Sequence, residues 1–306
     1  MSLDGVLPVL KPVGFTSHDV VAKARRILRM KRIGHTGTLD PQVTGVLPLC
    51  IGRATKLVEY IQELPKEYEA VLRIGVSTDT EDMTGEIVSS VDSVTLTESQ
   101  IRSAVGNFLG EISQVPPMYS AVKVDGKRLY ELARQGEVVE RKARQVFIYS
   151  IDILELKLDK QHPDIRFRVK CSKGTYIRTL CVDIGKALGY PAAMAELTRT
   201  STGHISMDQC YTLDQIQKAQ ETGDISSLLI PVERMVSHMP RMVILDSRLK
   251  QALQGQKLPV SFVSGITGNE RDVIAAFTEQ EKLVGFYQLD PSVQRLVPVK
   301  IYSDQV

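Results

Sequence analysis

Apolar residues recur along the first third of the chain with the spacings of short strands and amphipathic helices. A strand is predicted over residues 6–10, and a strand with alternating apolar side chains over 68–76. Helical spacing follows Thr16 and again Thr97, and in both places a side chain three positions later can complete a capping box. A shorter amphipathic helix is predicted over residues 54–61. This part of the chain therefore mixes helices and strands.

The middle of the chain contains a segment that fits neither a central strand nor a separate core. Residues 115–122 include Pro116 and Pro117, which remove backbone donors that a central strand needs. Residues 123–144 are polar and mostly basic, and we interpret them as an excursion from the domain that is helical over 129–134. The elements predicted after this excursion are strands at 146–156 and 165–171 and a helix at 176–188.

The pattern changes again near Pro240. A helix around residues 249–253 precedes a stretch rich in strands and turns, which suggests a small β-rich unit. The strands predicted there are 273–277 and 283–288. A chain of 306 residues is long for one domain and sufficient for two. We therefore predict an α+β protein with one domain over residues 1–238 and a smaller one over 239–306.

Charge is distributed unevenly although the net charge is only +2. Residues 23–32 carry six basic side chains and no acidic one, whereas residues 79–98 carry six acidic side chains and no basic one. Such a polarised field suits one face of the molecule to a polyanion. The basic run lies on a predicted helix, whose face is either simply solvated or in contact with phosphates. We expect the acidic stretch to form a loop or edge hairpin away from the nucleic acid.

Cysteine usage and hydropathy bear on the cellular compartment. The four cysteines lie far apart without the spacing of a metal site, which argues for reduced thiols and against zinc. No apolar run approaches the length of a membrane-spanning helix, and the N-terminus lacks a signal-peptide core. We therefore expect a cytoplasmic protein that makes no contact with a membrane.

Residues 34–45 form the stretch with the most distinctive chemistry. They read Gly-His-Thr-Gly-Thr-Leu-Asp-Pro-Gln-Val-Thr-Gly and hold one carboxylate, Asp40. The glycines permit positive φ, and Pro41 disfavours the helical region for Asp40, so this loop can aim a side chain. The other interpretation is that Asp-Pro starts a turn while His35 and Thr36 satisfy backbone groups. Composition alone favours that second interpretation.

Residues 34–41, followed by 44–47 and 52–56, resemble the catalytic motif of the TruB family, the bacterial tRNA pseudouridine-55 synthases. The resemblance continues to about residue 205, in the same order and spacing. Its further motifs are residues 11–17, 66–68, 116–123 and 171–178. One departure is Gln42-Val43, where the family pattern has an apolar or small pair.

The resemblance implies a pseudouridine synthase fold, in which a central mixed and mostly antiparallel sheet is flanked by helices. It makes residues 123–144 an RNA-gripping thumb, and the tail over 239–306 is similar to a PUA domain, an RNA-binding module. The substrate would be the T-arm of tRNA, and the enzyme would be a monomer that needs no protein partner, no metal and no cofactor.

The resemblance also assigns roles to individual residues. Asp40 would be the catalytic carboxylate, and Arg178 would hold it in position. Tyr68 would stack on a uridine flipped out of the RNA, and His35 would take the place of that base or its neighbours. The remaining assignments are pocket walls from Tyr176 and Leu197 and support of the loop by Lys11. Without the resemblance, Arg178 and Lys11 could be surface residues and Tyr68 a core or rim residue.

The implied reaction breaks the C1′–N1 bond of uridine, turns the uracil and rejoins it through C5. An ionised aspartate can begin this reaction by adding to C6, by attacking C1′ or by promoting loss of the 2′ proton, and we favour a route through C1′ or C2′. The main alternative function is a non-catalytic RNA-binding or tRNA-folding protein. That alternative gives no reason for a lone acid among basic residues, because the acid would weaken phosphate binding. Phosphotransferases and glycosidases need further carboxylates that this loop lacks.

Overall fold

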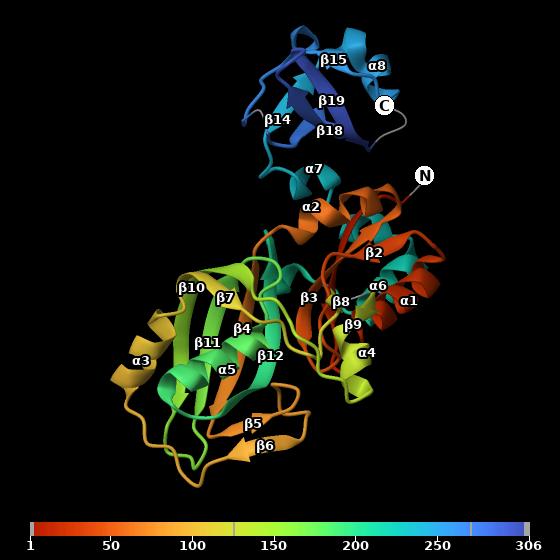
Figure 1. Cartoon of the computed structure of the whole chain (residues 1–306). Coiled ribbons are helices and arrows are strands. Elements are labelled where there is room, and N and C mark those ends of the chain that lie inside the picture. The colour runs from red at the N-terminus through yellow and green to blue at the C-terminus, as the bar shows by residue number, and fades with distance from the viewer. Residues whose placement is uncertain (1–2, 125, 270, 303–306) are drawn as a thin grey trace.

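The computed structural model describes residues 3–124, 126–269 and 271–302 of the chain (Figure 1). Residues 1, 2, 125, 270 and 303–306 lie outside this description, so the predicted domain ends and one position of the predicted thumb fall there. Within the described part of the chain, every helix is too short or too polar to span a membrane.

The largest sheet has the strand order β1-β3-β12-β4-β11-β10-β7, with β2 paired to β3 and β13 paired to β12. Only the pairing of β12 with β3 is parallel among these described strands. The prediction of a mixed and mostly antiparallel central sheet is therefore confirmed. Its strands are β1 (Gly5–Lys11), β2 (Ile33–His35), β3 (Thr44–Ile51), β4 (Lys66–Ile74), β7 (Gly110–Gln114), β10 (Arg144–Lys157), β11 (Asp164–Cys171), β12 (Ala192–Thr202) and β13 (Ile205–Ser206).

Helices cover this sheet in two groups (Figure 1). α3 (Glu98–Gly106) and α5 (Ile177–Leu188) pack on β4, β10, β11 and β12 through one apolar cluster. α1 (Ser17–Leu28) and α6 (Leu213–Thr222) pack on β1 and β3 through another. Both predicted capping boxes are present, at the N-termini of α1 and α3. The predicted helix over 54–61 is a 3₁₀-helix, η1 (Gly52–Leu57), that continues as α2 (Val58–Gln62).

Two small hairpins project from the sheet. One pairs β5 (Val76–Thr78) with β6 (Ile87–Ser90) inside the acidic stretch. The other pairs β8 (Lys123–Val124) with β9 (Lys127–Arg128) and leads into α4 (Leu129–Arg134), which matches the helical segment predicted in the excursion. Residues 115–122 form no strand, as expected from Pro116 and Pro117.

The tail forms a second, six-stranded sheet in the order β15-β19-β18-β17-β14-β16, with its own apolar core (Figure 1). A further apolar cluster joins this sheet to the remainder of the chain. In it, Phe286 stacks on Tyr60 of α2 with ring centroids 4.0 Å apart. The elements of the tail and of the connection to it are η2 (Met207–Gln209), η3 (Ile225–Leu228), α7 (Val232–Met235), β14 (Arg241–Ile244), η4 (Asp246–Arg248), α8 (Leu249–Leu253), β15 (Leu258–Pro259), η5 (Val260–Phe262), β16 (Val263–Ser264), β17 (Ile274–Phe277), β18 (Leu283–Asp290) and β19 (Arg295–Ile301).

Candidate active site

The loop that holds Asp40 runs from β2 to β3 and is fixed by side chains from the N-terminal segment. The buried Lys11 donates a hydrogen bond from Nζ to the Pro41 carbonyl, at 3.1 Å. The buried Ser17 hydroxyl accepts one from the Leu39 amide, at 2.9 Å. These two bonds flank Asp40 in the sequence, so its backbone is held on both sides.

Two of the three predicted loop glycines have the expected backbone conformation. Gly37 has φ +152° and Gly45 has φ +108°, whereas Gly34 pairs regularly within β2. A Cβ atom on Gly45 would collide with the backbone of Arg199 in the parallel neighbour β12. Gly45 therefore allows β3 and β12 to approach closely just after the loop.

Arg178 lies beside Asp40, with Nη2 3.2 Å from Asp40 Oδ2. The guanidinium also donates to the Thr80 carbonyl at 2.9 Å and to the Tyr119 carbonyl at 2.7 Å. The Arg178 side chain is 6% exposed, whereas that of Asp40 is 43% exposed. Arg178 is thus a buried cation with three partners, two carbonyls and the Asp40 carboxylate. Solvent or a ligand can reach that carboxylate.

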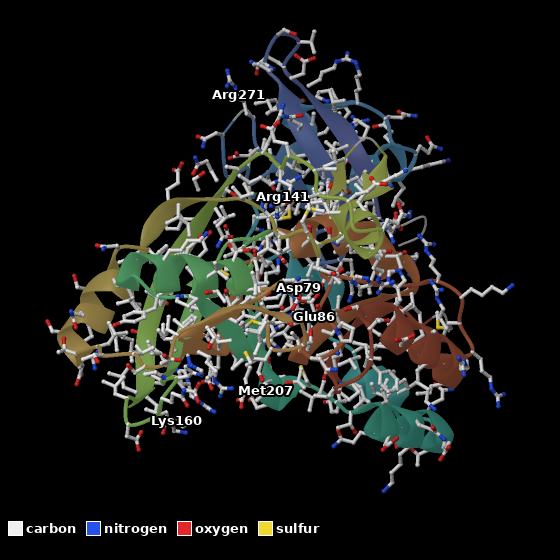
Figure 2. All side chains as sticks on the ribbon, turned by 60° about the horizontal axis from the view of Figure 1, so that its bottom comes forward. Asp79, Glu86, Arg141, Lys160, Met207 and Arg271 are labelled. Atoms are coloured by element: carbon white, nitrogen blue, oxygen red, sulfur yellow. The ribbon has the colours of Figure 1, made fainter. Side chains whose placement is uncertain are left out.

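The turn between β5 and β6 supports this arrangement, so part of the predicted acidic hairpin lies behind Arg178. Thr80 of this turn holds Arg178, and backbone hydrogen bonds join the turn to Met194 of β12. Asp79 and Glu86 lie over the middle of the molecule in Figure 2. The hairpin follows directly from β4, and this connection allows its turn to reach Arg178 and β12.

Asp40 and Arg178 open onto a cavity of about 330 Å³, a volume in the range of small-molecule pockets. Tyr68, Tyr176 and Leu197 line the same cavity. They come from β4, from the residue that precedes α5, and from β12. The structure therefore brings these five predicted site residues together from segments that are far apart in the sequence.

Two tyrosines at the cavity differ in how their surroundings act on them. Tyr68 is half-buried, and burial raises the pKa of its phenol, so the hydroxyl stays protonated at neutral pH. Tyr176 donates its amide to Gln114 Oε1 at 3.0 Å, and Gln114 Nε2 donates to the Tyr176 carbonyl at 3.2 Å. These bonds set the N-terminal end of α5, which also carries Arg178.

His35 and Lys11 lie beside the cavity lining rather than within it. His35 packs edge-on against His18, with ring centroids 5.3 Å apart, and burial lowers its pKa, so the imidazole is neutral. Lys11 is fully buried, and this burial lowers its pKa to about 8. Lys11 is therefore no surface lysine, and its bond to Pro41 matches the predicted support of the loop.

Comparisons with known proteins identify the family of this chain. Residues 25–177 match the model of the TruB family pseudouridylate synthase N-terminal domain, and residues 178–237 match that of the tRNA pseudouridylate synthase B C-terminal domain. The chain is 45% identical over 304 residues to tRNA pseudouridine synthase B of Bacillus pumilus, covering 98% of both chains. It is 44% identical to the protein of that name from Bacillus subtilis, covering 98% of this chain and 97% of the relative. The chain belongs to the TruB family.

Solved structures extend the comparison to the whole TruB-family fold. A chain in a crystal structure of a Cbf5-Nop10-Gar1 complex superposes with a TM-score of 0.77 at 29% identity. A chain in an H/ACA RNP bound to a substrate RNA containing 2′-deoxyuridine superposes with a TM-score of 0.76 at 28% identity. Both matches cover 98% of this chain and 85% of the other. The similarity therefore includes the C-terminal sheet.

Sequence analysis assigned no role to two cations of this TruB-family site. Arg199 is 2% exposed and Lys66 is 6% exposed, and both line the cavity. Lys66 donates to the carbonyls of Gln62 and Leu64, and burial lowers its pKa to about 8. Arg199 is two residues beyond Leu197, so the alternation of a strand through this segment would have placed both on one face.

The described residues offer few ligands for a metal ion. No group of three or more histidine, cysteine, aspartate and glutamate side chains is arranged to hold one in the described part of the chain.

Proposed function

We propose that this protein converts uridine to pseudouridine at position 55, in the T-arm of tRNA, with Asp40 as the catalytic carboxylate. One observation carries the proposal: among the described residues that line the cavity, Asp40 is the single acidic side chain. It stands next to the buried Arg178 and shares the cavity with Lys66, Lys173 and Arg199. A binding protein for phosphates would gain nothing from an acid at this point, because the acid repels its ligand.

The proposed chemistry needs few groups. The C1′–N1 bond breaks and a C1′–C5 bond forms, while the hydrogen on C5 leaves and N1 gains a proton. The reaction therefore needs no oxidant or reductant. Asp40 can supply the electron pair that attacks C1′ or removes the 2′ proton, and Arg178 keeps that carboxylate aimed into the cavity. Addition to C6 uses the same carboxylate, although we favour a route through C1′ or C2′.

The target uridine must leave its stack to reach Asp40, and extrusion costs a few kcal/mol. We assign to the ring of Tyr68 the contact that offsets the cost of extrusion, because stacking on an aromatic side chain contributes about 1–3 kcal/mol per base. Tyr176 and Leu197 would close the sides of the cavity. His35, whose lowered pKa leaves it uncharged, would fill space vacated by the base or its neighbours.

The surrounding surface supports an RNA partner. The exposed basic residues of α1 and the hairpin with α4 would contact phosphates, the hairpin and α4 acting as the thumb over 123–144. We propose that residues 239–306 form a PUA-like RNA-binding domain beside a catalytic domain over 1–238. We propose further that the protein acts as a monomer in the cytoplasm.

Modification mapping tests this proposal. A tRNA transcript and a T-arm hairpin are incubated with the purified protein in EDTA, derivatised with carbodiimide and read by primer extension. We expect one new stop at position 55 in both RNAs and none in transcripts that carry cytidine there. Tight binding without any stop would favour the alternative of a non-catalytic RNA-binding or tRNA-folding protein, and a stop elsewhere would correct the position.

A further inference from the structure

Arg199 occupies an unusual position for an arginine. It lies in β12, directly opposite Tyr68 of β4 in the antiparallel pairing of the two strands. Directly opposite residues project from the same face of a sheet, so the guanidinium lies on the side of the Tyr68 ring. Arg199 is 2% exposed and yet lines the same cavity as Asp40.

The hydrogen bonds of this guanidinium go to neutral acceptors, and its charge also helps burial to lower the pKa values of Lys11 and Lys66. Nε donates to the Val46 carbonyl at 2.6 Å, and Nη2 donates to the Gly37 carbonyl at 3.4 Å. The positive charge of Arg199 also acts on the phenol of Tyr68, where it lowers the pKa against the larger effect of burial. Among the described residues, no carboxylate oxygen lies within 4.0 Å of Arg199.

A buried charge without a carboxylate partner costs stability, because the protein dipoles around it replace water incompletely. An apolar side chain of similar volume would fill the space between β4 and β12 without that cost. The contacts of Arg199 therefore indicate a role other than packing. They join the loop before Asp40 to the strand after it, on the face of the sheet from which Tyr68 projects.

We propose that Arg199 is a positioning residue, whose single guanidinium ties the Asp40 loop at Gly37 to β3 at Val46, directly beside Tyr68, and so fixes the carboxylate relative to the Tyr68 ring. This proposal rests on the proposed function and adds a group that acts without touching the substrate. The distance between the carboxylate and a stacked base depends on that relation, and small misplacements of reacting groups are costly in rate.

The geometry also explains why the residue is an arginine. A guanidinium has donors pointing in several directions in one plane, so it can serve the carbonyls of Val46 and Gly37 at once. A lysine ammonium is a point charge on a flexible stem and holds two separated partners poorly. A positive charge at position 199 should therefore be insufficient to hold both carbonyls without the planar guanidinium.

The first test compares Arg199→Lys and Arg199→Met in single-turnover assays at saturating enzyme, together with tRNA affinity by filter binding. We expect each variant to lower the rate constant at least 30-fold while the tRNA dissociation constant stays within threefold. Millimolar guanidinium should partly restore Arg199→Ala, whereas urea at the same concentration should not. Arg199→Lys with a rate within threefold of the unsubstituted protein would overturn the proposal.

The second test asks whether Arg199 and Tyr68 act together. Tyr68→Phe removes the hydroxyl and keeps the ring, so we expect tRNA affinity to persist while the single-turnover rate falls between 5- and 20-fold. In the Arg199→Lys background the same change should cost less than twofold, because the relation between the Tyr68 ring and the Asp40 carboxylate is already disturbed. A Tyr68→Phe rate within twofold of the unsubstituted protein, or full additivity in the double variant, would contradict the proposal.

Controls separate this inference from the proposed function. Arg102→Ala removes an exposed arginine from the outer helix α3 and should leave rate and affinity unchanged. If the unsubstituted protein forms no pseudouridine, the proposed function fails and the two tests have no rate to compare. If it forms pseudouridine and the Arg199 and Tyr68 variants match it, only the role of Arg199 fails.

Discussion

Arg178 Nη2 lies 3.2 Å from Asp40 Oδ2, although the Arg178 side chain is 6% exposed and that of Asp40 is 43% exposed. The guanidinium is held by two backbone carbonyls as well as by the carboxylate. Its position therefore does not depend on the substrate, and the carboxylate is the member of the pair that a ligand can reach. Substitutions of Asp40 and of Arg178 should therefore have different effects.

Asp40→Asn removes the negative charge and keeps nearly the same shape. We expect it to lower the single-turnover rate by at least about 1,000-fold, because an amide neither attacks carbon nor takes a proton readily. The tRNA dissociation constant should change by less than about threefold, since the repulsion of phosphates is slightly reduced. Tritium release from uracil-labelled tRNA measures the rate, and Asp152→Asn on β10 is the matched control. Comparable rates for Asp40→Asn and the unsubstituted protein would remove Asp40 from the chemistry.

Arg178→Ala leaves the Asp40 carboxylate without its cation and two carbonyls without a donor. We expect a loss of turnover of about 100-fold or more, whereas Arg178→Lys should lose less because it keeps the charge. Arg168→Ala breaks an exposed ion pair with Glu69 on the sheet and should stay close to full activity. Steady-state kinetics with one tRNA transcript distinguish the three variants, and an Arg178→Ala turnover equal to that of Arg168→Ala would contradict the assigned role.

RNA binding should weaken steeply with salt if the basic face of α1 contacts phosphates. Lys23 and Arg26 are exposed on that face. The double change Lys23→Ala with Arg26→Ala should reduce the slope of log affinity against log salt by about 1 to 2 units. Lys186→Ala with Lys218→Ala removes two exposed lysines from α5 and α6 and should leave the slope unchanged. A flat salt response of the unsubstituted protein would exclude phosphate contact as a main source of affinity.

Lys66 should make stability depend on pH in a specific window. Burial lowers its pKa from 10.5 to about 8, so the unfolded state binds its proton more tightly than the folded state. The resulting penalty is present below pH 8 and is relieved as pH rises from about 8 towards 10.5. Relative to Lys66→Met, the unsubstituted protein should therefore gain on the order of 2 kcal/mol in free energy of unfolding between pH 7 and pH 9.5.

Urea unfolding of both proteins at the two pH values measures this difference. The comparison with Lys66→Met is necessary because burial raises the pKa of four cysteine thiols, which lowers stability in the same range in both proteins. The four thiols cancel in the difference. If the two proteins differ in free energy of unfolding by the same amount at pH 7 and pH 9.5, Lys66 keeps its ordinary pKa in the folded protein.

Local signals in the chain were sufficient for most elements that have a periodic pattern. The capping boxes at Thr16 and Thr97 predicted the starts of α1 and α3, since those bonds form within one turn. β12 was not predicted, because its sequence from Ala192 to Thr202 is small and polar rather than alternating. Its strand conformation comes from pairing with β3 and β4 on its two sides.

The sequence by itself determined that one carboxylate, Asp40, stands in a loop able to present it, and family motifs named Arg178 as its neighbour. Only the tertiary structure decided that the two side chains meet, that the acidic hairpin reaches Arg178 through Thr80, and that Arg199 lies opposite Tyr68. The reason is physical. Periodicity and capping act over a few residues, whereas burial of a charge depends on strands that are distant in the chain and adjacent in the sheet.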